Sequence, residues 1–272
     1  MDDQILSLEH ISLSYHTMKG ETPALCDLTF SVTPGEFVAL VGPSGCGKST
    51  LGRTILRLIE PTSGQILYNG DDITKYNTRQ MKKMRQELQI IFQDPYASLD
   101  PRKSVIEIIA EYMIINKTLP KKREIFNRAA HLMDVVGLAR RYATAYPHEL
   151  DGGRRQRIGI ARALSVNPKF IVCDEPVSAL DVSIQAQILN LLMDLQDDMG
   201  LTYMFVTHDL SVVKHISDNI MVMYLGQCLE LTSSDELFAK PVHPYTQALL
   251  SAIPEPDISM RNKEIKVIKG EV

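Results

Sequence analysis

The residues from Gly42 to Thr50 form a glycine-rich loop whose types and spacing suit the binding of a phosphate chain. They read G-P-S-G-C-G-K-S-T and fit the pattern G-x-x-x-x-G-K-[ST]. Glycines let backbone N–H groups point inward around anionic oxygens at the start of a helix. The lysine can then reach the outer phosphates, and the hydroxyl beside it can offer an oxygen to Mg²⁺. The sequence therefore predicts nucleoside triphosphate binding by Gly42, Pro43, Ser44, Gly45, Cys46, Gly47, Lys48, Ser49 and Thr50.

This loop lies between a predicted strand and a predicted helix. Residues 36–41 read EFVALV, an apolar run that we interpret as a buried strand, and residues 51–58 are predicted to be helical. The strand–loop–helix setting makes the pattern a specific sign of phosphate binding. The alternative is a glycine-rich turn that only begins a helix, and the Lys-Ser-Thr after the last glycine disfavours it.

Polar side chains follow three further apolar runs that we predict to be strands. Gln93 follows one of them, and Asp174 and Glu175 end a second. His208 follows the third. Because the carboxyl ends of parallel strands face the ligand crevice of an α/β sheet, we expect these groups to gather beside the loop. Asp174 can hold Mg²⁺, and Glu175 can polarise a water for in-line attack on a γ-phosphate.

Each of these residues also has a purely structural interpretation. Asp174 and Glu175 could form a solvated pair at a helix start, which the phosphate loop upstream makes the weaker reading. For His208 alone, a simple helix cap is the strong alternative. Gln93 and His208 become convincing only when they are taken together.

The rest of the pattern predicts an α/β fold: a P-loop NTPase core with an antiparallel β subdomain and an inserted helical subdomain. Residues 5–15 and 28–32 read as strands ahead of the loop, which predicts a β layer beside the main sheet. From residue 104 to residue 136 the apolar spacing becomes helical, which predicts the insertion, and we assign about residues 94–167 to this helical subdomain. We assign residues 1–255 to this single domain and residues 256–272 to a C-terminal tail.

Other elements are predicted from apolar periodicity and capping residues. We expect helices over residues 78–87, about 151–166 and 183–199, with Asp151 as the N-cap of the second. Residues 220–231 are predicted to form a closing hairpin.

The composition is that of a soluble globular protein and restricts the classes of partner. The chain has 272 residues, with 44% hydrophobic and 23% charged residues. A net charge of −4 argues against a general nucleic-acid binder, which usually carries a basic surplus. No apolar run approaches the roughly 18 residues of a membrane-spanning helix, and the acidic start lacks the basic beginning of a signal peptide. The four cysteines have no C-x-x-C spacing, which predicts neither a disulfide framework nor a zinc site and favours the cytosol.

Cys46 lies inside the phosphate loop, where the start of a helix stabilises a thiolate. We therefore predict that modification of Cys46 blocks nucleotide binding and that the magnesium nucleotide protects it. The alternative is a shielded, unreactive thiol.

Taken in order, these motifs closely resemble those of the nucleotide-binding subunit of ABC transporters. The resemblance rests on Tyr15, the phosphate loop, Gln93, the Gly152-Gly153 helix, Asp174-Glu175-Pro176, Ser178 to Asp181, and His208, and it runs from about residue 5 to residue 255. It implies an ATPase that uses ATP and Mg²⁺. The residues that it implies for catalysis are Glu175, His208, Gln93 and Lys48.

The resemblance also assigns roles to particular side chains. Tyr15 is implied to stack on adenine, Glu175 to be the general base and His208 to be the switch histidine. Gln93 is implied to sense the γ-phosphate and Mg²⁺ while facing the membrane subunits. The implied metal ligands are Ser49, Gln93 and Asp174. The implied signature, which faces a partner's nucleotide, is Leu150, Asp151, Gly152, Gly153 and Arg154, and the D-loop at the dimer interface is Ser178, Ala179, Leu180 and Asp181.

Two stretches resemble a particular branch of that family. Residues 93–102 (QDPYASLDPR) and 243–254 (HPYTQALLSAIP) are similar to the second ATPase subunit of dipeptide, oligopeptide and nickel importers. The resemblance implies peptide import energised from the cytoplasmic face of the cell membrane. The implied partners are a second ABC ATPase subunit in a hetero- or homodimer, two membrane-spanning permease subunits and an external substrate-binding protein, with no nucleic acid.

The sequence departs from the family at its signature. Residues 150–154 read L-D-G-G-R, where the family usually has L-S-G-G-Q. Ionised Asp151 can only accept hydrogen bonds, and Arg154 is spaced to neutralise it as an i,i+3 neighbour. The family's subunits also tend to continue past residue 271 into a cysteine-bearing tail, so no metal cluster of such a tail is assigned to this chain.

Three alternatives stay open from the sequence. The first is the same role in a nickel or metallophore importer. The second is a soluble ABC ATPase of translation or DNA repair, although such proteins usually carry two cassettes or a long coiled coil. The third is a module that holds ATP without hydrolysing it, against which the presence of Glu175 and His208 argues.

Overall fold

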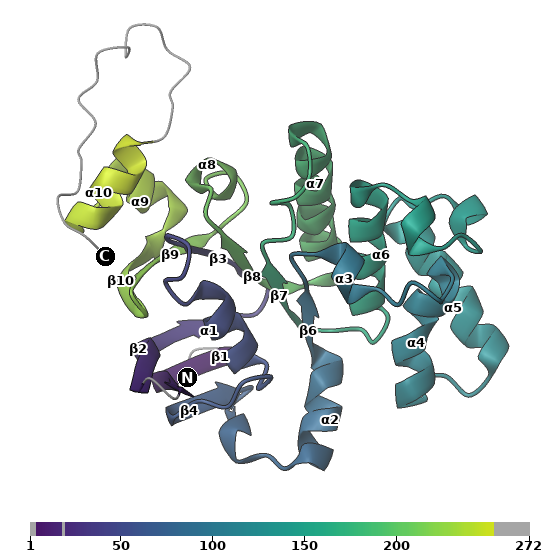
Figure 1. Ribbon diagram of the computed structural model, residues 1–272, viewed down its shortest axis with the longest axis horizontal. Coiled ribbons are helices and arrows are strands. Elements are labelled where there is room, and N and C mark those ends of the chain that lie inside the picture. Colours follow the sequence, from purple (N-terminus) through teal and green to yellow (C-terminus); the bar gives the residue numbers. More distant parts are fainter. Residues whose placement is uncertain (1–3, 18–19, 253–272) are drawn as a thin grey trace, which may run out of the picture.

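The computed structural model describes residues 4–17 and 20–252, and its centre is a mostly parallel sheet. Within the described residues this sheet has six strands in the order β10-β9-β3-β8-β7-β6 (Figure 1). Strands β6, β7, β8, β3 and β9 pair in parallel, whereas β10 pairs antiparallel with β9. The bounds are β3 (Phe37–Val41), β6 (Leu88–Ile91), β7 (Phe170–Asp174), β8 (Thr202–Thr207), β9 (Asn219–Tyr224) and β10 (Gln227–Ser233).

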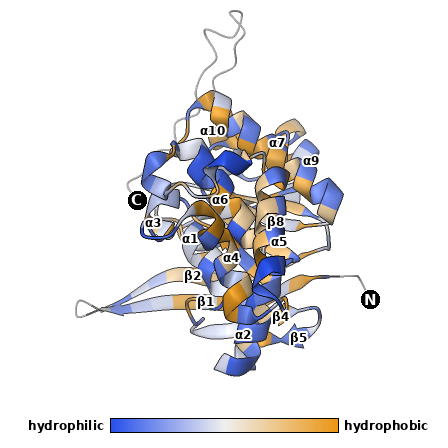
Figure 2. Cartoon of the chain, turned by 90° about the vertical axis from the view of Figure 1, so that its right-hand side faces the viewer, coloured by the Kyte–Doolittle hydropathy of each residue, from blue (hydrophilic) through white to orange (hydrophobic). Residues whose placement is uncertain are grey.

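The central strands read as continuous apolar runs because both faces of the sheet are covered. Every residue of β3, β7 and β8 is buried. Figure 2 shows β8 as predominantly hydrophobic and helix α2 (Thr78–Glu87) as predominantly hydrophilic. The polar residues Asp174, Glu175 and His208 lie at the carboxyl ends of these strands, where the apolar runs stop.

A second sheet is antiparallel and precedes most of the core strands in the chain. In the described residues its order is β2-β1-β4-β5. Its strands are β1 (Leu6–Thr17), β2 (Gly20–Val32), β4 (Ser63–Tyr68) and β5 (Asp71–Asp72). The register pairs Leu6 with Val32 and Leu8 with Phe30, so alternate apolar residues share one face. That face belongs to one hydrophobic cluster with residues of α1 (Lys48–Ile55) and the central sheet, such as Leu51 and Val172.

Helices form a lobe at the end of the molecule next to β6 (Figure 1). Its members are α3 (Pro95–Ser98), α4 (Val105–Asn116), α5 (Lys122–Val135), the 3₁₀ turns Arg140–Tyr142 and Pro147–Glu149, and α6 (Gly152–Leu164). Ser104 and Glu107 form a capping box at the start of α4, and Gly137 with φ 66° follows the end of α5. The apolar faces of α4, α5 and α6 share one buried cluster with a face of the central sheet.

The other helices lie along the sheet and near the C-terminal end of the described residues. They are α2 (Thr78–Glu87), α7 (Val182–Met199), α8 (Leu210–Val213), α9 (Ser234–Ala239) and α10 (Pro244–Ser251), with a 3₁₀ turn over Ile73–Lys75. In Figure 1, α9 and α10 lie beside β9 and β10, at the end of the molecule opposite the helical lobe.

Most predicted elements are present, with some shifted bounds. The helix after the phosphate loop runs over Lys48–Ile55 rather than residues 51–58, because Gly47 serves as its N-cap and Arg57 turns out of the helix with φ 48°. Residues 28–32 are the end of the much longer β2. The short helices α3 and α8 were not predicted, since four residues are too few to show helical periodicity. The division at residue 255 stays a prediction, because residues 253–272 lie outside the described part of the chain.

Candidate functional site

The phosphate loop connects the buried strand β3 to helix α1. Gly45 and Gly47 have φ values of 79° and 105°, which an L side chain rarely adopts. Gly47 is the N-cap of α1, so the first N–H groups of the helix follow directly from the loop. The loop and the helix start therefore bring successive backbone N–H groups to the carboxyl end of β3.

Two carbonyl groups press against the back of this loop. A Cβ on Gly42 would lie 2.3 Å from the carbonyl oxygen of Met223 at the end of β9. A Cβ on Gly47 would lie 2.6 Å from the carbonyl oxygen of Ala24 in β2. Both positions thus require glycine for space as well as for conformation. The loop therefore packs between β9 of the central sheet and β2 of the antiparallel sheet.

Lys48 is held by the loop itself. Its side chain is almost fully buried, and its ammonium donates to the carbonyl oxygens of Gly42 at 2.8 Å and Pro43 at 2.9 Å. These bonds fix a positive charge at the centre of the loop. A bound phosphate would compete with the two carbonyls for the same ammonium hydrogens.

The structure contradicts the predicted reactivity of Cys46. Its side chain is buried, with Sγ 3.9 Å from Nζ of Lys48. Burial raises the pKa of this thiol above its ordinary value of 9.0 and outweighs the opposing effect of Lys48. The helix start does not produce a thiolate here, because the sulfur faces the interior instead of the ligand side of the loop.

Asp174, the last residue of β7, lies beside the first turn of α1. Its Oδ1 accepts a hydrogen bond from Oγ of Ser49 at 2.6 Å. Its Oδ2 lies 3.4 Å from Nη2 of Arg53, so a carboxylate that is almost fully buried has a charged partner. Sequence reasoning missed Arg53. Arg53 follows Ser49 by four residues, which places both on one face of α1, but its contact with Asp174 becomes visible only once α1 lies against β7.

Gln93, Glu175 and His208 are brought together as predicted. Nε2 of Gln93 donates to Oε2 of Glu175 at 3.0 Å, and Nδ1 of His208 lies 3.6 Å from the same oxygen. Each residue follows a different strand, so the parallel sheet alone places them at one edge. Glu175 is thereby held next to Asp174 and the phosphate loop.

Glu175 has an unusual backbone conformation. Its φ is 46°, in the left-handed region that non-glycine residues seldom adopt. Its N–H donates to the carbonyl oxygen of Val206 at 3.1 Å, and its own carbonyl accepts from Oγ of Ser178 at 3.1 Å. These bonds hold a strained residue in place, as is common at functional sites.

Oxygen donors suited to Mg²⁺ converge beside the loop. The hydroxyl of Ser49 and the carboxylate of Asp174 are in direct contact at 2.6 Å. Gln93 uses its amide nitrogen on Glu175, which leaves its amide oxygen for a cation. Mg²⁺ prefers hard oxygen ligands such as these, so the residues present fit the ion.

The signature residues form the start of α6. Asp151 is the N-cap, and its Oδ1 accepts the N–H of Arg154 at 2.8 Å. The guanidinium of Arg154 pairs with the other carboxylate oxygen and lies 5.0 Å from the ring centroid of Tyr142. The predicted neutralising pair is therefore formed. Leu150 is buried just ahead of the cap.

The two signature glycines lie where α6 meets the D-loop and α7. A Cβ on Gly152 would lie 3.1 Å from Cδ2 of Leu180, and one on Gly153 would lie 2.6 Å from Cγ2 of Ile184. Asp181 caps α7 by accepting the N–H of Ile184 at 3.0 Å. The signature and the D-loop, Ser178, Ala179, Leu180 and Asp181, are thus adjacent within one chain.

Tyr15 lies near the other side of the phosphate loop. It is 42% exposed and pairs with Thr22 in the register of β1 and β2. Thr22 is two residues before Ala24, whose carbonyl presses on the loop at Gly47. An exposed aromatic ring therefore lies on the strand pair that contacts the phosphate loop through Ala24.

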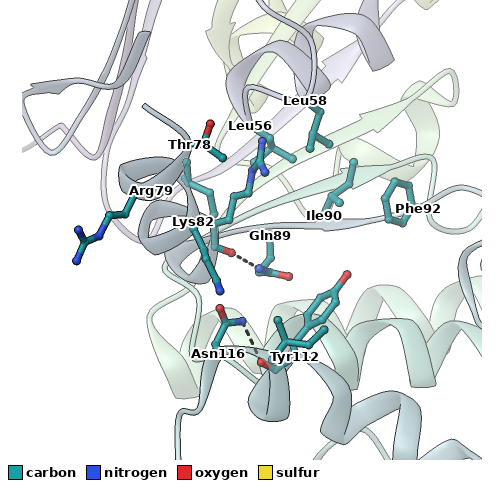
Figure 3. Close-up of a pocket in the computed structure, with 13 residues that line it drawn as sticks. Leu56, Leu58, Thr78, Arg79, Lys82, Gln89, Ile90, Phe92, Tyr112 and Asn116 are labelled. Atoms are coloured by element: carbon teal, nitrogen blue, oxygen red, sulfur yellow. Dashed lines mark hydrogen bonds between the residues drawn. The ribbon is translucent and has the colours of Figure 1, made fainter. Parts of the chain in front are cut away.

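A groove of about 710 Å³ lies between α2 and α4, and the sequence did not reveal it (Figure 3). Apolar side chains from the core and from α4 line it, among them Leu58, Ile90, Phe92, Tyr112 and Ile115. Three basic residues of α2 also line it, namely Arg79, Lys82 and Arg85. Leu58 and Ile115 are 48% and 55% exposed, so the groove offers an uncovered apolar surface with basic groups beside it.

The groove and the site are adjacent in the chain, because Phe92, which lines the groove, directly precedes Gln93. In the described residues, no helix has both the length and the apolar character needed to cross a membrane.

Comparison with protein families gives two matches along the chain. The family model described as ABC transporter matches residues 25–178. The model described as oligopeptide/dipeptide transporter, C-terminal region, matches residues 229–272.

Individual relatives match over nearly the whole chain. The oligopeptide transport ATP-binding protein OppF of Bacillus subtilis (strain 168) is 50% identical over 267 residues, covering 98% of this chain and 88% of the relative. The oligopeptide transport ATP-binding protein AppF of the same organism is 50% identical over 258 residues, covering 93% and 77%. A solved dimeric structure of the ATP-binding cassette MJ0796, in a post-hydrolysis state bound to ADP and Pi, matches with a TM-score of 0.77 and 29% identity, covering 84% of this chain and 98% of that one. The predicted fold class is thereby confirmed.

Proposed function

The chain belongs to the ABC transporter family, and we propose that it is the ATP-hydrolysing subunit that energises import of peptides across the cytoplasmic membrane. The observation that carries the hydrolytic part is the meeting of Gln93 and His208 on one oxygen of Glu175. The names of the relatives and the match to the oligopeptide/dipeptide C-terminal region support peptide as the cargo.

ATP is proposed to bind along the phosphate loop and beside Tyr15. The N–H groups that follow Gly47 donate hydrogen bonds to the phosphate oxygens. The ammonium of Lys48 leaves the carbonyl oxygens of Gly42 and Pro43 and donates to phosphate oxygens instead. Tyr15 stacks on the adenine, for which its exposed ring is available.

Ser49, Asp174 and Gln93 are proposed to hold Mg²⁺. When bound, the ion supplies positive charge to the β- and γ-phosphate oxygens. Asp174 is already oriented for this role by Ser49 on one oxygen and by Arg53 on the other.

Glu175 is proposed to be the general base. Its carboxylate orients a water and accepts a proton from it as the water oxygen bonds to the γ-phosphorus. The bond from that phosphorus to the departing ADP oxygen breaks in the same step. Gln93 and His208 keep the carboxylate aimed, since both contact the same oxygen.

A second ATPase subunit is proposed as a partner, in a hetero- or homodimer. The similarity to a solved dimeric cassette supports such a pair. Residues 150–154 would then face the partner's nucleotide, with Ser178 to Asp181 at the interface. The acidic net charge of −4 gives no support for a nucleic-acid partner.

The groove between α2 and α4 is proposed to receive a cytoplasmic segment of a membrane-spanning permease subunit. Its apolar lining suits the apolar face of a short helix, and Arg79, Lys82 and Arg85 suit acidic residues on that helix. Two permease subunits and an external substrate-binding protein complete the proposed importer. The chain is then peripheral on the cytoplasmic face.

The proposal is tested with the assembled importer in proteoliposomes that contain ATP. We expect ATP-dependent uptake of a labelled oligopeptide, which Glu175→Gln abolishes in this chain. Uptake of Ni²⁺ instead of peptide would overturn the cargo assignment. Failure of the hydrolysing chain to associate with the permease subunits would overturn the import role.

Replacement of a groove residue provides a second test. Ile115→Asp places a carboxylate in the apolar part of the groove, and we expect loss of permease binding with ATP binding retained. Ile114→Asp is the matched control, because Ile114 is 45% exposed on the same helix but does not line this groove.

A further inference from the structure

Helix α10 is tied firmly to the end of the central sheet. The carboxylate of Glu230 in β10 accepts the N–H groups of Val242 at 2.8 Å and His243 at 3.0 Å. Nδ1 of His243 then caps the helix by accepting the N–H of Tyr245 at 3.1 Å. These contacts explain why residues 243–247 (HPYTQ) form the start of α10. They leave open what the helix does for the nucleotide site.

Tyr245 connects α10 to strand β9. Its ring lies 4.7 Å from the ring of Tyr224, measured between centroids, with the planes tilted by 44°. Tyr224 is the last residue of β9. Burial raises the pKa of the Tyr245 hydroxyl, and the neighbouring Cys46 and Tyr224 add to that rise. The ring pair therefore lies at the end of β9, beside Met223.

Met223 and Gly226, which flank Tyr224 and Leu225, contact the loop directly. The carbonyl of Met223 occupies the space that a Cβ on Gly42 would need, at 2.3 Å. The N–H of Gly226 donates to the carbonyl oxygen of Cys46 at 2.9 Å. The carbonyl of Gly226 in turn accepts the N–H of Cys26 in β2 at 2.8 Å. The end of β9 thus lies between α10 on one side and the phosphate loop on the other.

We propose that Tyr245 is a positioning residue for the phosphate loop, acting through Tyr224 and the turn after β9. The inference rests on the proposed ATP binding by this loop. A nest of N–H groups binds phosphate well only when the loop is already in its bound shape, because ordering it later costs affinity. The aromatic pair holds Met223 and Gly226 against Gly42 and Cys46, and so keeps that shape. The C-terminal helix consequently sets the nucleotide affinity from behind the loop.

The first test is an equilibrium titration of the purified full chain with the fluorescent nucleotide MANT-ATP in the presence of Mg²⁺. We expect Tyr245→Ala to weaken binding on the order of fivefold, within the usual coupling between residues in contact. Tyr245→Phe keeps the ring pair and should bind as the native chain does. Leu250→Ala is the matched control, because Leu250 packs on the same hydrophobic cluster as Tyr245 but is not the residue that pairs with Tyr224. It should lower the melting temperature but leave the affinity unchanged.

The second test uses the reciprocity of coupled sites. Saturating MANT-ATP should slow amide hydrogen exchange in residues 244–251 of the native chain and of Tyr245→Phe, but not of Tyr245→Ala. Native affinity in Tyr245→Ala, or an equal loss in Leu250→Ala, would overturn the proposal. A native chain that does not bind MANT-ATP would instead overturn the proposed function, so the two failures are distinguishable.

Discussion

Asp151 caps helix α6 and pairs with the side chain of Arg154, the residue whose backbone it also binds. Its Oδ1 accepts the N–H of Arg154 at 2.8 Å, and its Oδ2 contacts the guanidinium. Tyr142 supports the same guanidinium from its ring face, with the ring centroid at 5.0 Å. A carboxylate at this helix start therefore carries its own counter-charge.

Loss of that counter-charge should impair the site that the signature faces in the proposed dimer. A bare carboxylate about 4 Å from a phosphate oxygen costs on the order of 4 kcal/mol per charge pair at an effective dielectric of 20. We expect Arg154→Gln alone to slow the partner's site at least tenfold, and Asp151→Ser with Arg154→Gln to match or exceed the native rate. The measurement is ATP turnover by the assembled pair, with this chain's own site silenced by Glu175→Gln. An unchanged rate in Arg154→Gln would show that Asp151 does not face a phosphate.

Glu175→Gln should separate nucleotide binding from hydrolysis. The amide keeps the size of the side chain but cannot accept a proton, so turnover should fall by at least roughly a hundredfold while ATP affinity stays near native. His208→Ala should have a smaller effect, because Gln93 still contacts the same oxygen at 3.0 Å. Single-turnover phosphate release and MANT-ATP titration measure the two quantities. Near-native turnover in Glu175→Gln would remove this residue as the base.

Cys46 should resist alkylation in the native protein. Burial raises the pKa of its thiol above 9.0, so the thiolate is scarce at neutral pH and becomes abundant only in more alkaline solution. We expect iodoacetamide to label Cys26, which is partly exposed, well before Cys46. Mass spectrometry of both peptides gives the order, and the denatured chain serves as the control. Rapid labelling of Cys46 at neutral pH would restore the original prediction from sequence.

Glu230 should make the anchoring of α10 dependent on pH. Burial alone would raise the pKa of this carboxyl, but the hydroxyl of Thr246 and the N–H groups of Val242 and His243 outweigh it and lower the pKa below its ordinary value of 4.5. The stabilisation is therefore complete above pH 4.5 and is lost as the pH falls through the lowered value. We expect Glu230→Gln to reduce the melting temperature at neutral pH and to differ little from native well below pH 4.5. Circular dichroism melts across this range decide it, and a pH-independent difference would refute the role of the charge.

Much of the site could be predicted because it depends on local patterns. The glycines before Lys48 mark the phosphate loop, and the polar residues after apolar runs mark the carboxyl ends of the strands. The parallel sheet then brings Gln93, Glu175 and His208 together without further information. The pairing of Asp151 with Arg154 also follows from helical spacing alone.

What could not be predicted depends on contacts between segments far apart in the chain. Arg53 meets Asp174 across α1 and β7, which no local pattern relates. The sign of the pKa shift at Cys46 was wrong, because the sequence does not show that the thiol faces the interior behind the loop. The groove is lined by α2 and α4, which precede and follow β6 in the chain, so neither helix alone indicates it.

The left-handed backbone of Glu175 has a consequence for how such chains diverge. A non-glycine residue at φ 46° costs on the order of 1 kcal/mol, which Asn or Gly at the same position would largely relieve. We therefore expect an inactive chain with Asn or Gly at residue 175 to fold more stably than the active one. Stability alone would favour the loss of this carboxylate over generations. We therefore expect Glu175 to be retained only where hydrolysis itself is under selection.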